Sequence, residues 1–136
     1  MKVVPYLYFN GNCEEAFNFY HKVLGGSQSE IMRYGSQGPE IPAEIANRVM
    51  HAELVLGDDL MYFSDTSEEG EYQPGMNVQI NLNIDTEEEI RRIFEGLSAG
   101  ANITMPLQDT FWGAIYGALT DQFGVNWSFN HQKPEN

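Results

Sequence analysis

Residues 5–26, PYLYFNGNCEEAFNFYHKVLGG, predict a strand, a helix and a helix stop in succession. Tyrosines alternate with apolar residues at the start, as in a strand with one buried face. Asn12 and Glu15 fit a helix N-cap and its capping-box partner, and Gly26 fits the end of the helix. Between them an apolar stripe with i, i+3, i+4, i+7 spacing predicts one buried helix face: Ala16, Phe19, Tyr20 and Val23.

The same pattern recurs 74 residues further along the chain. Caps, glutamates and glycines correspond in pairs: Asn12 and Thr86, Glu15 and Glu89, Gly26 and Gly100. The apolar stripe recurs too, as Ile90, Ile93, Phe94 and Leu97. We therefore predict an internal duplication, with one amphipathic helix in each half.

Strand-like runs follow each predicted helix. In the first half they are Ser29–Arg33, Val49–Leu56 and Leu60–Asp65, and in the second Asn102–Leu107, Gly113–Thr120 and Val125–Asn130. Turn residues separate the last two runs of each half, at 57–59 and 121–124. The prediction is one α+β domain over residues 1–136, made of two βαβββ modules at about 1–66 and 76–131 with a linker at about 66–75. The first module also carries an insertion at 35–48, rich in Gly, Pro and polar residues.

Composition narrows the range of partners. The chain has 20 acidic and 7 basic residues, a formal net charge of −13, so neither nucleic acid nor an anionic membrane is an expected partner. The N-terminal sequence lacks the features of a signal peptide, and a cytoplasmic location is expected. The single cysteine, Cys13, excludes an internal disulfide. At the first turn of a helix its pKa is expected to be lowered by the helix dipole, although a buried or incidental cysteine is the simpler interpretation.

Strand alternation places polar and aromatic side chains together on one face of each sheet. Tyr6 and Tyr8 share a face in the first strand, as do Gln79 and Asn81 at residues 78–84, where the apolar residues Val78, Ile80, Leu82 and Ile84 point the other way. Two interpretations stay open from the residues alone. The polar faces are either solvated or a subunit contact, or they line a ligand cleft.

Three segments resemble the vicinal-oxygen-chelate superfamily of glyoxalase, bleomycin-resistance and dioxygenase proteins, and most closely its PhnB-like branch. They are PYLYFNGNCEEAFNFYHKVLGG at 5–26, VMHAELVLGDDLMYFSD at 49–65 and MPLQDTFWGAIYGALTDQFGVNW at 105–127. The resemblance covers essentially the whole chain. It implies an open, curved mixed-sheet barrel with helices outside, a ligand cleft inside and a homodimer.

Enzymes of that superfamily use a metal held by His, Gln or Glu on four strands. The matching positions here are Tyr6, Phe63, Gln79 and Ser128. Only Gln79 is an ordinary ligand type, because divalent cations in open sites prefer carboxylates and imidazoles. We therefore expect neither the family's metal centre nor any other cofactor, and we see no glycine-rich loop that would hold a methyl donor.

Chemistry could still reside elsewhere. His51 and Glu53 share a strand face, roughly 7 Å apart by strand rise, and form a candidate acid–base pair. Asp65 is a turn-type residue that could also join these two in a relocated metal site. Trp112 and Tyr116 are candidates for an aromatic cleft wall.

Three hypotheses follow. The first is a metal-free protein that binds a small molecule through Tyr6, Tyr8, Phe63, Gln79, Asn81, Trp112, Tyr116 and Ser128. The second is a lyase- or isomerase-type enzyme that uses His51, with or without a relocated metal site. The third is a structural or interaction module. The missing ligands favour the first.

Overall fold

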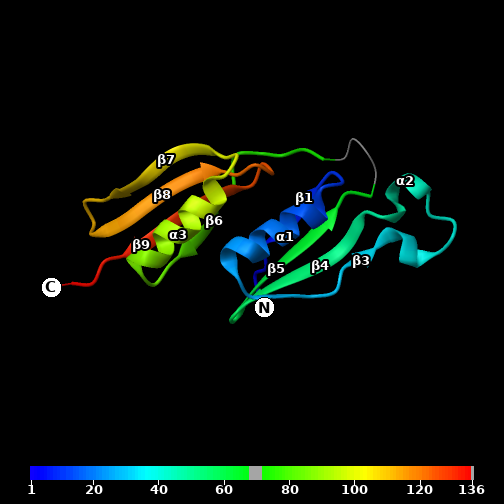
Figure 1. Ribbon diagram of the computed structural model, residues 1–136, viewed down its shortest axis with the longest axis horizontal. Coiled ribbons are helices and arrows are strands. Elements are labelled where there is room, and N and C mark those ends of the chain that lie inside the picture. The colour runs from blue at the N-terminus through cyan, green and yellow to red at the C-terminus, as the bar shows by residue number, and fades with distance from the viewer. Residues whose placement is uncertain (68–71, 136) are drawn as a thin grey trace. The chain divides into compact units, whose positions relative to one another are not determined.

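The structure is a computed structural model that describes residues 1–67 and 72–135 (Figure 1). The chain divides into two compact units, Met1–Gln73 and Pro74–Asn136. No helix in the described ranges is long and apolar enough to cross a membrane.

The first unit contains one long helix and a mixed sheet. Its elements are β1 (Tyr6–Phe9), α1 (Cys13–Leu24), β2 (Ser27–Gln28), β3 (Met32–Arg33), the 3-10 helix η1 (Tyr34–Gln37), α2 (Ala43–Ala46), β4 (Val49–Leu56) and β5 (Asp59–Asp65). The strand order is β1-β5-β4-β2, and β3 also pairs with β4. Strand β1 runs parallel to β5, and the other pairs are antiparallel.

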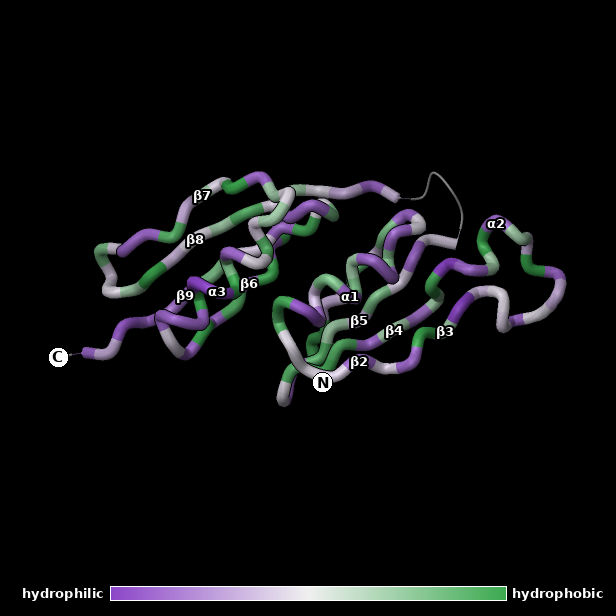
Figure 2. The backbone as a smooth tube through the Cα atoms, in the orientation of Figure 1, coloured by the Kyte–Doolittle hydropathy of each residue, from purple (hydrophilic) through white to green (hydrophobic). Residues whose placement is uncertain are grey.

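The second unit repeats this plan. It contains β6 (Ile80–Asn83), α3 (Glu87–Ser98), β7 (Asn102–Asp109), β8 (Ala114–Thr120) and β9 (Asn126–Gln132). The strand order is β6-β9-β8-β7, with β6 parallel to β9. Hydrophobic and hydrophilic residues alternate along β7 (Figure 2). The predicted α+β class with two open mixed sheets is confirmed, and both ends of α1 and α3 differ by the predicted 74 residues.

The helix ends confirm part of the predicted capping. In α3, Thr86 Oγ1 accepts a hydrogen bond from the Glu89 amide at 3.1 Å, as a capping box requires. In α1, Asn12 makes no side-chain cap, and that part of the prediction is wrong. The Asp65 carboxylate instead holds the first amide of the helix, since Oδ1 accepts from the Cys13 amide at 3.0 Å. A cap supplied from a distant strand is invisible to a local sequence pattern.

The predicted strand at residues 29–33 is also wrong in detail. Only Met32 and Arg33 of it form a strand, β3, whereas β2 at Ser27–Gln28 comes before it, and the pairing of β3 with β4 has an irregular register. Ser29 between the two strands accepts at Oγ from the Glu53 amide at 2.8 Å, so a side chain replaces a backbone acceptor there. The insertion predicted at 35–48 contains two helical turns, η1 and α2.

The core of the first unit lies between α1 and one face of the sheet. Phe63 is fully buried at its centre, with ring centroids 5.1 Å from Phe17 and 5.9 Å from Tyr20. Of the predicted stripe, Ala16, Tyr20 and Val23 are buried, but Phe19 is only half-buried and Phe17 is buried in its place. In the second unit α3 buries the predicted Ile90, Ile93 and Leu97. The polar sheet face opposite each helix is the one that carries the candidate site residues.

Candidate functional site

The face of the first sheet that points away from α1 carries five aromatic or titratable side chains. We call this set the tyrosine face: Tyr6 and Tyr8 on β1, Tyr62 on β5, and His51 and Glu53 on β4. Register explains why they meet, since Tyr62 is the direct partner of Tyr6 on one side and of Glu53 on the other. Side chains alternate along a strand, so the neighbours of these residues face the core instead.

A chain of two hydrogen bonds crosses this face. Tyr6 Oη lies 2.8 Å from His51 Nδ1, and His51 Nε2 lies 2.8 Å from Glu53 Oε2. A carboxylate only accepts, so in neutral His51 the proton belongs on Nε2 and is donated to Glu53. His51 Nδ1 is then the acceptor of the Tyr6 hydroxyl proton. The order is phenol, imidazole, carboxylate, with one tautomer that satisfies both bonds.

The environment keeps the proton on Tyr6. Partial burial is the main cause that raises the pKa of the Tyr6 phenol above its usual value of 10.0, and the nearby Tyr8 and Tyr34 add to it. Solvent still reaches the set: Tyr6 is 42% exposed, and the side chains of His51 and Glu53 are 26% and 36% exposed. A bound molecule could therefore contact all three groups.

The aromatic rings pack closely around the hydrogen-bonded chain. The rings of Tyr6 and Tyr8 are stacked with centroids 4.9 Å apart and planes at 14°. Tyr62 meets Tyr6 edge-on at 5.4 Å and His51 at 4.9 Å. Tyr8 is 53% exposed, which leaves an aromatic surface next to the polar groups. Such a surface suits a planar apolar ligand that also carries a polar group.

Sequence reasoning found most of this set but not all of it. Tyr6, Tyr8, His51 and Glu53 were predicted, and the structure brings them together. Phe63, predicted beside them, lies on the opposite face with no exposed surface. Its neighbour Tyr62 occupies the place expected for Phe63, a residue that we missed. The signal was present, because Met61 and Phe63 are the apolar members of an alternating strand.

The predicted residues of the second half lie in the second unit. Ser128 pairs with Asn81 across β9 and β6, and its hydroxyl donates to Asn81 Oδ1 at 2.9 Å. Gln79 is exposed just before β6. Trp112 is 51% exposed in the turn before β8, with its ring 6.3 Å from that of Tyr116. The sheet face opposite α3 is thus polar and carries hydroxyl and amide groups.

Two buried aspartates have structural roles. Asp65 Oδ1 accepts from the Gly11 and Cys13 amides at 2.7 and 3.0 Å, and Oδ2 accepts from the Val49 amide at 2.9 Å. This carboxylate holds the start of α1 to the start of β4. It cannot also join His51 in a relocated metal site, because that site would lie on the other face of the sheet.

Asp121 acts in the same way in the second unit. It accepts from the Phe123 and Val125 amides at 2.8 and 3.0 Å and from the Trp127 indole at 2.8 Å. The carboxylate thereby fixes the β8–β9 turn and the largest side chain of that core.

The family's metal does not fit the residues present. The Tyr6 hydroxyl keeps its proton in a hydrogen bond to His51, and Phe63 has no atom that could bind a metal. The Ser128 hydroxyl donates a hydrogen bond to Asn81. In the described ranges, no group of three or more His, Cys, Asp or Glu side chains could hold a metal ion. We therefore derive no step through a metal.

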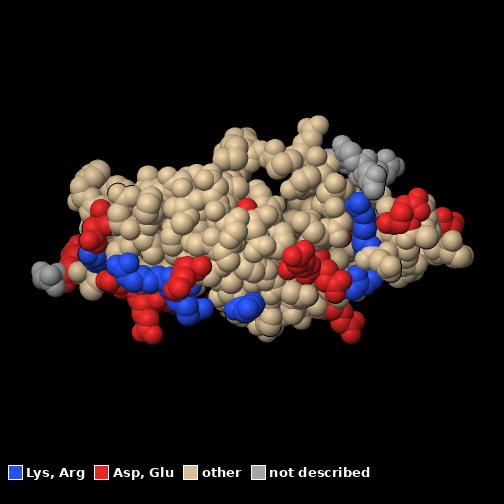
Figure 3. Space-filling view, turned by 45° about the horizontal axis from the view of Figure 1, so that its top comes forward, with Lys and Arg blue, Asp and Glu red and all other residues tan. Residues whose placement is uncertain are grey.

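Cys13 and the surface charges give no further site. Burial raises the pKa of the Cys13 thiol, with Asp65 and Glu14 adding to the effect, so the expected lowering by the helix dipole is wrong. Several basic residues pair with acids on their own unit: Arg33 with Glu14, Arg91 with Glu87, Arg92 with Glu89, and Lys133 with Asp109. Acidic and basic side chains lie beside one another on the face in Figure 3.

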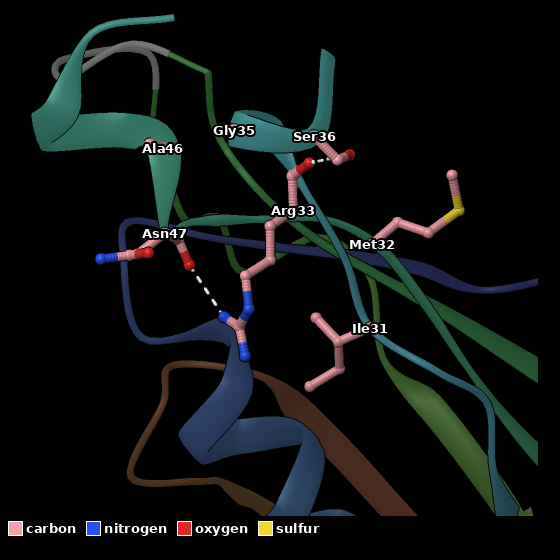
Figure 4. A pocket seen from close by; sticks show the side chains of 7 residues that line it. All are labelled: Ile31, Met32, Arg33, Gly35, Ser36, Ala46 and Asn47. Carbon is pink, nitrogen blue, oxygen red and sulfur yellow. Dashed lines mark hydrogen bonds between the residues drawn. The ribbon is translucent and has the colours of Figure 1, made fainter. Parts of the chain in front are cut away.

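A hollow of about 490 Å³ lies beside β3, lined by Ile31, Met32, Arg33, Gly35, Ser36, Ala46 and Asn47 (Figure 4). The Arg33 guanidinium donates to the Asn47 carbonyl at 2.9 Å and to Glu14 at 3.0 Å, and Ser36 donates to the Arg33 carbonyl at 2.7 Å. These bonds attach the insertion to β3 and α1. The polar groups around the hollow therefore have a structural use already.

Two βαβββ units with parallel outer strand pairs and helices on one sheet face are typical of the glyoxalase fold. The family model "Glyoxalase/Bleomycin resistance protein/Dioxygenase superfamily" matches residues 2–129. The chain therefore belongs to this superfamily, as the resemblance implied.

Similar proteins cover nearly the full length. Escherichia coli protein YjdN is 30% identical over 99% of this chain and 98% of its own. The crystal structure of Pseudomonas aeruginosa protein PA1353 is 41% identical, covers 98% of this chain and 99% of its own, and has a TM-score of 0.88. A Bacillus cereus structure named "Putative 3-demethylubiquinone-9 3-methyltransferase, PhnB protein" is 28% identical with a TM-score of 0.81, over 96% and 99% of the two chains. The structural neighbours thus include PhnB-like proteins.

Proposed function

We propose that the protein binds a small, planar molecule on the tyrosine face, without the metal centre of its superfamily. The observation that carries this proposal is the hydrogen-bonded chain Tyr6–His51–Glu53 beside the stacked rings of Tyr6 and Tyr8. Binding sites combine apolar walls with a few placed polar groups that fix orientation. The tyrosine face supplies both, and the rings of Tyr6 and Tyr8 are partly exposed to solvent rather than covered by other side chains.

The burial pattern supports a binding role over a purely structural one. The core residues on the other side of the same strands, such as Leu7 and Phe63, are buried, and Phe63 packs against Phe17 and Tyr20 of α1. An aromatic ring exposed to water has an apolar surface that a ligand could cover. A structural or interaction module would not need a hydrogen-bonded imidazole and carboxylate there.

We propose further that the binding form is a homodimer. Several large apolar side chains in the second unit are exposed in the single chain: Met76, Val78, Ile103 and Met105. Ile103 and Met105 lie on β7, an edge strand of its sheet. Sedimentation equilibrium tests the proposal, and a mass of 15.4 kDa for the particle at micromolar concentration contradicts it.

We do not extend the methyltransferase activity in the name of the Bacillus cereus protein to this chain. The β1–α1 connection, where a bound cofactor could meet a helix N-terminus, is Asn10-Gly11-Asn12. The amides of Gly11 and Cys13 already bind the Asp65 carboxylate.

Ligand-observed NMR with a panel of small aromatic molecules tests the binding proposal. Tyr8→Ala removes a ring worth about 0.5–1.5 kcal/mol in stacking, so Kd should rise roughly two- to tenfold. His21→Ala is the control, because His21 lies on α1 and bonds to the Gly26 carbonyl. Equal losses in both variants, or no binding by any aromatic molecule, contradict the proposal. Elemental analysis of untagged protein tests whether binding occurs without a metal centre, and a stoichiometric transition metal overturns that part of the proposal.

A further inference from the structure

We infer that Tyr6, His51 and Glu53 form a metal-independent proton relay that exchanges the α-proton of a bound α-aryl carbonyl compound. This inference rests on the proposed function, because the compound is the planar molecule of the tyrosine face. It adds a reaction to what is otherwise a binding surface. Tyr6 is the group that meets the substrate, and His51 and Glu53 act through it.

The first support is the order of the three groups. A hydroxyl, an imidazole and a carboxylate follow one another at 2.8 Å and 2.8 Å. In this arrangement the imidazole can take the hydroxyl proton while the carboxylate orients the ring and stabilises the imidazolium that forms. The carboxylate reaches the nitrogen that does not face the hydroxyl, which is the geometry such a relay needs.

The second support is the resting protonation state. The raised pKa of Tyr6 keeps its hydroxyl protonated, and His51 Nδ1, the nitrogen that does not face Glu53, lies 2.8 Å from that hydroxyl as its acceptor. A tyrosinate at rest would leave no proton to relay. The Tyr6 hydroxyl can instead donate to His51 Nδ1, the nitrogen that the bond to Glu53 leaves as an acceptor.

The proton exchange needs no oxidant, reductant or other co-reactant. The α-carbon gives its proton to Tyr6 Oη while the Tyr6 hydroxyl proton moves to His51 Nδ1. The C–H electron pair becomes part of a C=C bond, and the carbonyl oxygen takes the negative charge of an enolate. The imidazolium is held by Glu53. Reversal returns a proton to the carbon, so the carbon is neither oxidised nor reduced.

The third support concerns the class of substrate. A phenol–imidazole pair acting without a metal needs a carbon acid whose anion is delocalised, and a carbonyl with a neighbouring aryl group provides this. The same aryl group has a partner in the exposed ring of Tyr8, stacked on Tyr6 at 4.9 Å. Because Tyr8 stacks on Tyr6, we infer that an aryl group bound on Tyr8 brings the attached acidic carbon towards Tyr6.

The relay differs from the structural hydrogen bonds of the fold. The buried carboxylates Asp65 and Asp121 hold backbone amides at element ends. Glu53 Oε2 instead accepts from the His51 side chain at 2.8 Å. The backbone amide of Glu53 donates separately to the Ser29 hydroxyl. The Tyr6–His51–Glu53 chain thus positions functional groups rather than backbone.

The test follows α-proton exchange of 2-tetralone in D2O by 1H NMR, with untagged, EDTA-treated full-length protein. This probe has an aryl ring, an acidic CH2 and a single carbonyl oxygen, so chelation of a metal by two oxygens plays no part. Its Kd is measured separately by line broadening in H2O. We expect exchange above the buffer rate, and a loss of about 100-fold or more of the catalysed rate in Tyr6→Phe and His51→Ala. Kd should rise far less than the exchange rate falls in both variants, because the ring of Tyr8 that stacks on the aryl group remains.

Two further variants separate chemistry from folding. Added imidazole should restore exchange to His51→Ala and not to Tyr6→Phe, an effect that a merely structural role of His51 does not produce. Glu53→Gln should retain partial exchange, because an amide oxygen can still orient the ring while the negative charge is lost. His21→Gln should exchange like the natural protein.

The outcomes distinguish the two proposals. Binding of 2-tetralone without exchange above buffer overturns the relay and leaves the binding proposal intact. Exchange that survives Tyr6→Phe also overturns the relay. No binding of 2-tetralone overturns the assigned substrate class, and no binding of any aromatic molecule overturns the proposed function as well.

Discussion

Tyr6 Oη and His51 Nδ1 lie 2.8 Å apart although their strands, β1 and β4, are not neighbours. Strand β5 lies between them, so their backbones are separated by about two strand spacings, near 10 Å. Two long side chains close this distance across Tyr62. The hydrogen bond therefore depends on the register of three strands.

This bond predicts the tautomer of His51. Because Glu53 accepts at Nε2, neutral His51 should carry its proton on Nε2 and leave Nδ1 as an acceptor for Tyr6. Long-range 1H–15N correlation spectra of the imidazole distinguish the two neutral tautomers directly. Glu53→Leu removes the acceptor and should give a mixture of tautomers. A neutral Nδ1-protonated His51 in the natural protein contradicts the geometry.

Asp65→Asn should destabilise the fold by about 3 kcal/mol. The carboxylate is 1% exposed and accepts from three backbone amides, whereas an asparagine offers one acceptor oxygen and introduces an unpaired NH2 group. Urea unfolding measures the change. Asp58→Asn in the exposed β4–β5 turn is the control and should change stability by less than about 0.5 kcal/mol. Equal effects of the two substitutions contradict the structural role assigned to Asp65.

Cys13 makes stability fall at high pH. The buried thiol has a pKa raised above its usual 9.0, while the unfolded thiol titrates near that value. The protonated form is favoured by folding, so this contribution is full below pH 9 and is lost as pH rises. At pH 10 ionisation should favour the unfolded state by about 1.4 kcal/mol relative to neutral pH.

Cys13→Ser removes this titrating group. The difference in unfolding free energy between the natural protein and the serine variant should therefore change between pH 8 and pH 10, measured in reducing buffer. The native thiol should also resist a disulfide reagent such as DTNB until the protein unfolds. Rapid modification of the native protein contradicts the burial of Cys13.

Gly25 and Gly26 at the end of α1 form a matched pair. Both have positive φ, +82° and +81°, so alanine is strained at either position. A Cβ at Gly26 would also lie 2.2 Å from the Val55 carbonyl oxygen, whereas a Cβ at Gly25 has nothing within 4 Å. Gly25→Ala should cost roughly 1 kcal/mol and Gly26→Ala at least 2 kcal/mol more, because backbone must move. Thermal unfolding of the two variants compares them.

The repeat made most of the fold predictable. Hydrophobic spacing and glycine stops gave α1 and α3, and alternation gave the strand pairs that position the site. Asn12 makes no cap, and the start of the helix is instead held by Asp65, 53 residues further along the chain, which accepts from the amides of Gly11 and Cys13. At Ser29, where the predicted strand was to begin, the hydroxyl accepts from the Glu53 amide instead, a contact that follows only from tertiary structure.

The candidate site was predictable up to strand register. Alternation fixed Tyr6 and Tyr8 on one face and His51 with Glu53 on another strand. Phe63 was predicted in place of Tyr62 because it came from the family's motif rather than from this alternation, and a shift of one residue exchanges the two faces of a strand. The structure places Tyr62 opposite both Tyr6 and Glu53.

Truncation of Phe63 should therefore affect mainly the stability of the protein, and truncation of Tyr62 mainly its binding of aromatic molecules. Phe63→Ala removes a fully buried ring that touches Phe9, Phe17 and Tyr20, and should cost about 3–5 kcal/mol of unfolding free energy. Tyr62→Ala removes a half-buried ring on the opposite face and should cost less than half as much, while it weakens the binding of aromatic molecules.

The two effects are measured on the same proteins, by urea unfolding and by ligand-observed NMR. Since Phe63→Ala could leave too little folded protein for a binding measurement, Phe63→Leu serves there, and it should retain Kd within about twofold while it still lowers stability. Binding that is lost in Phe63→Leu and unchanged in Tyr62→Ala would mean that the ligand does not contact the face on which Tyr62 lies, because the two side chains point to opposite sides of β5.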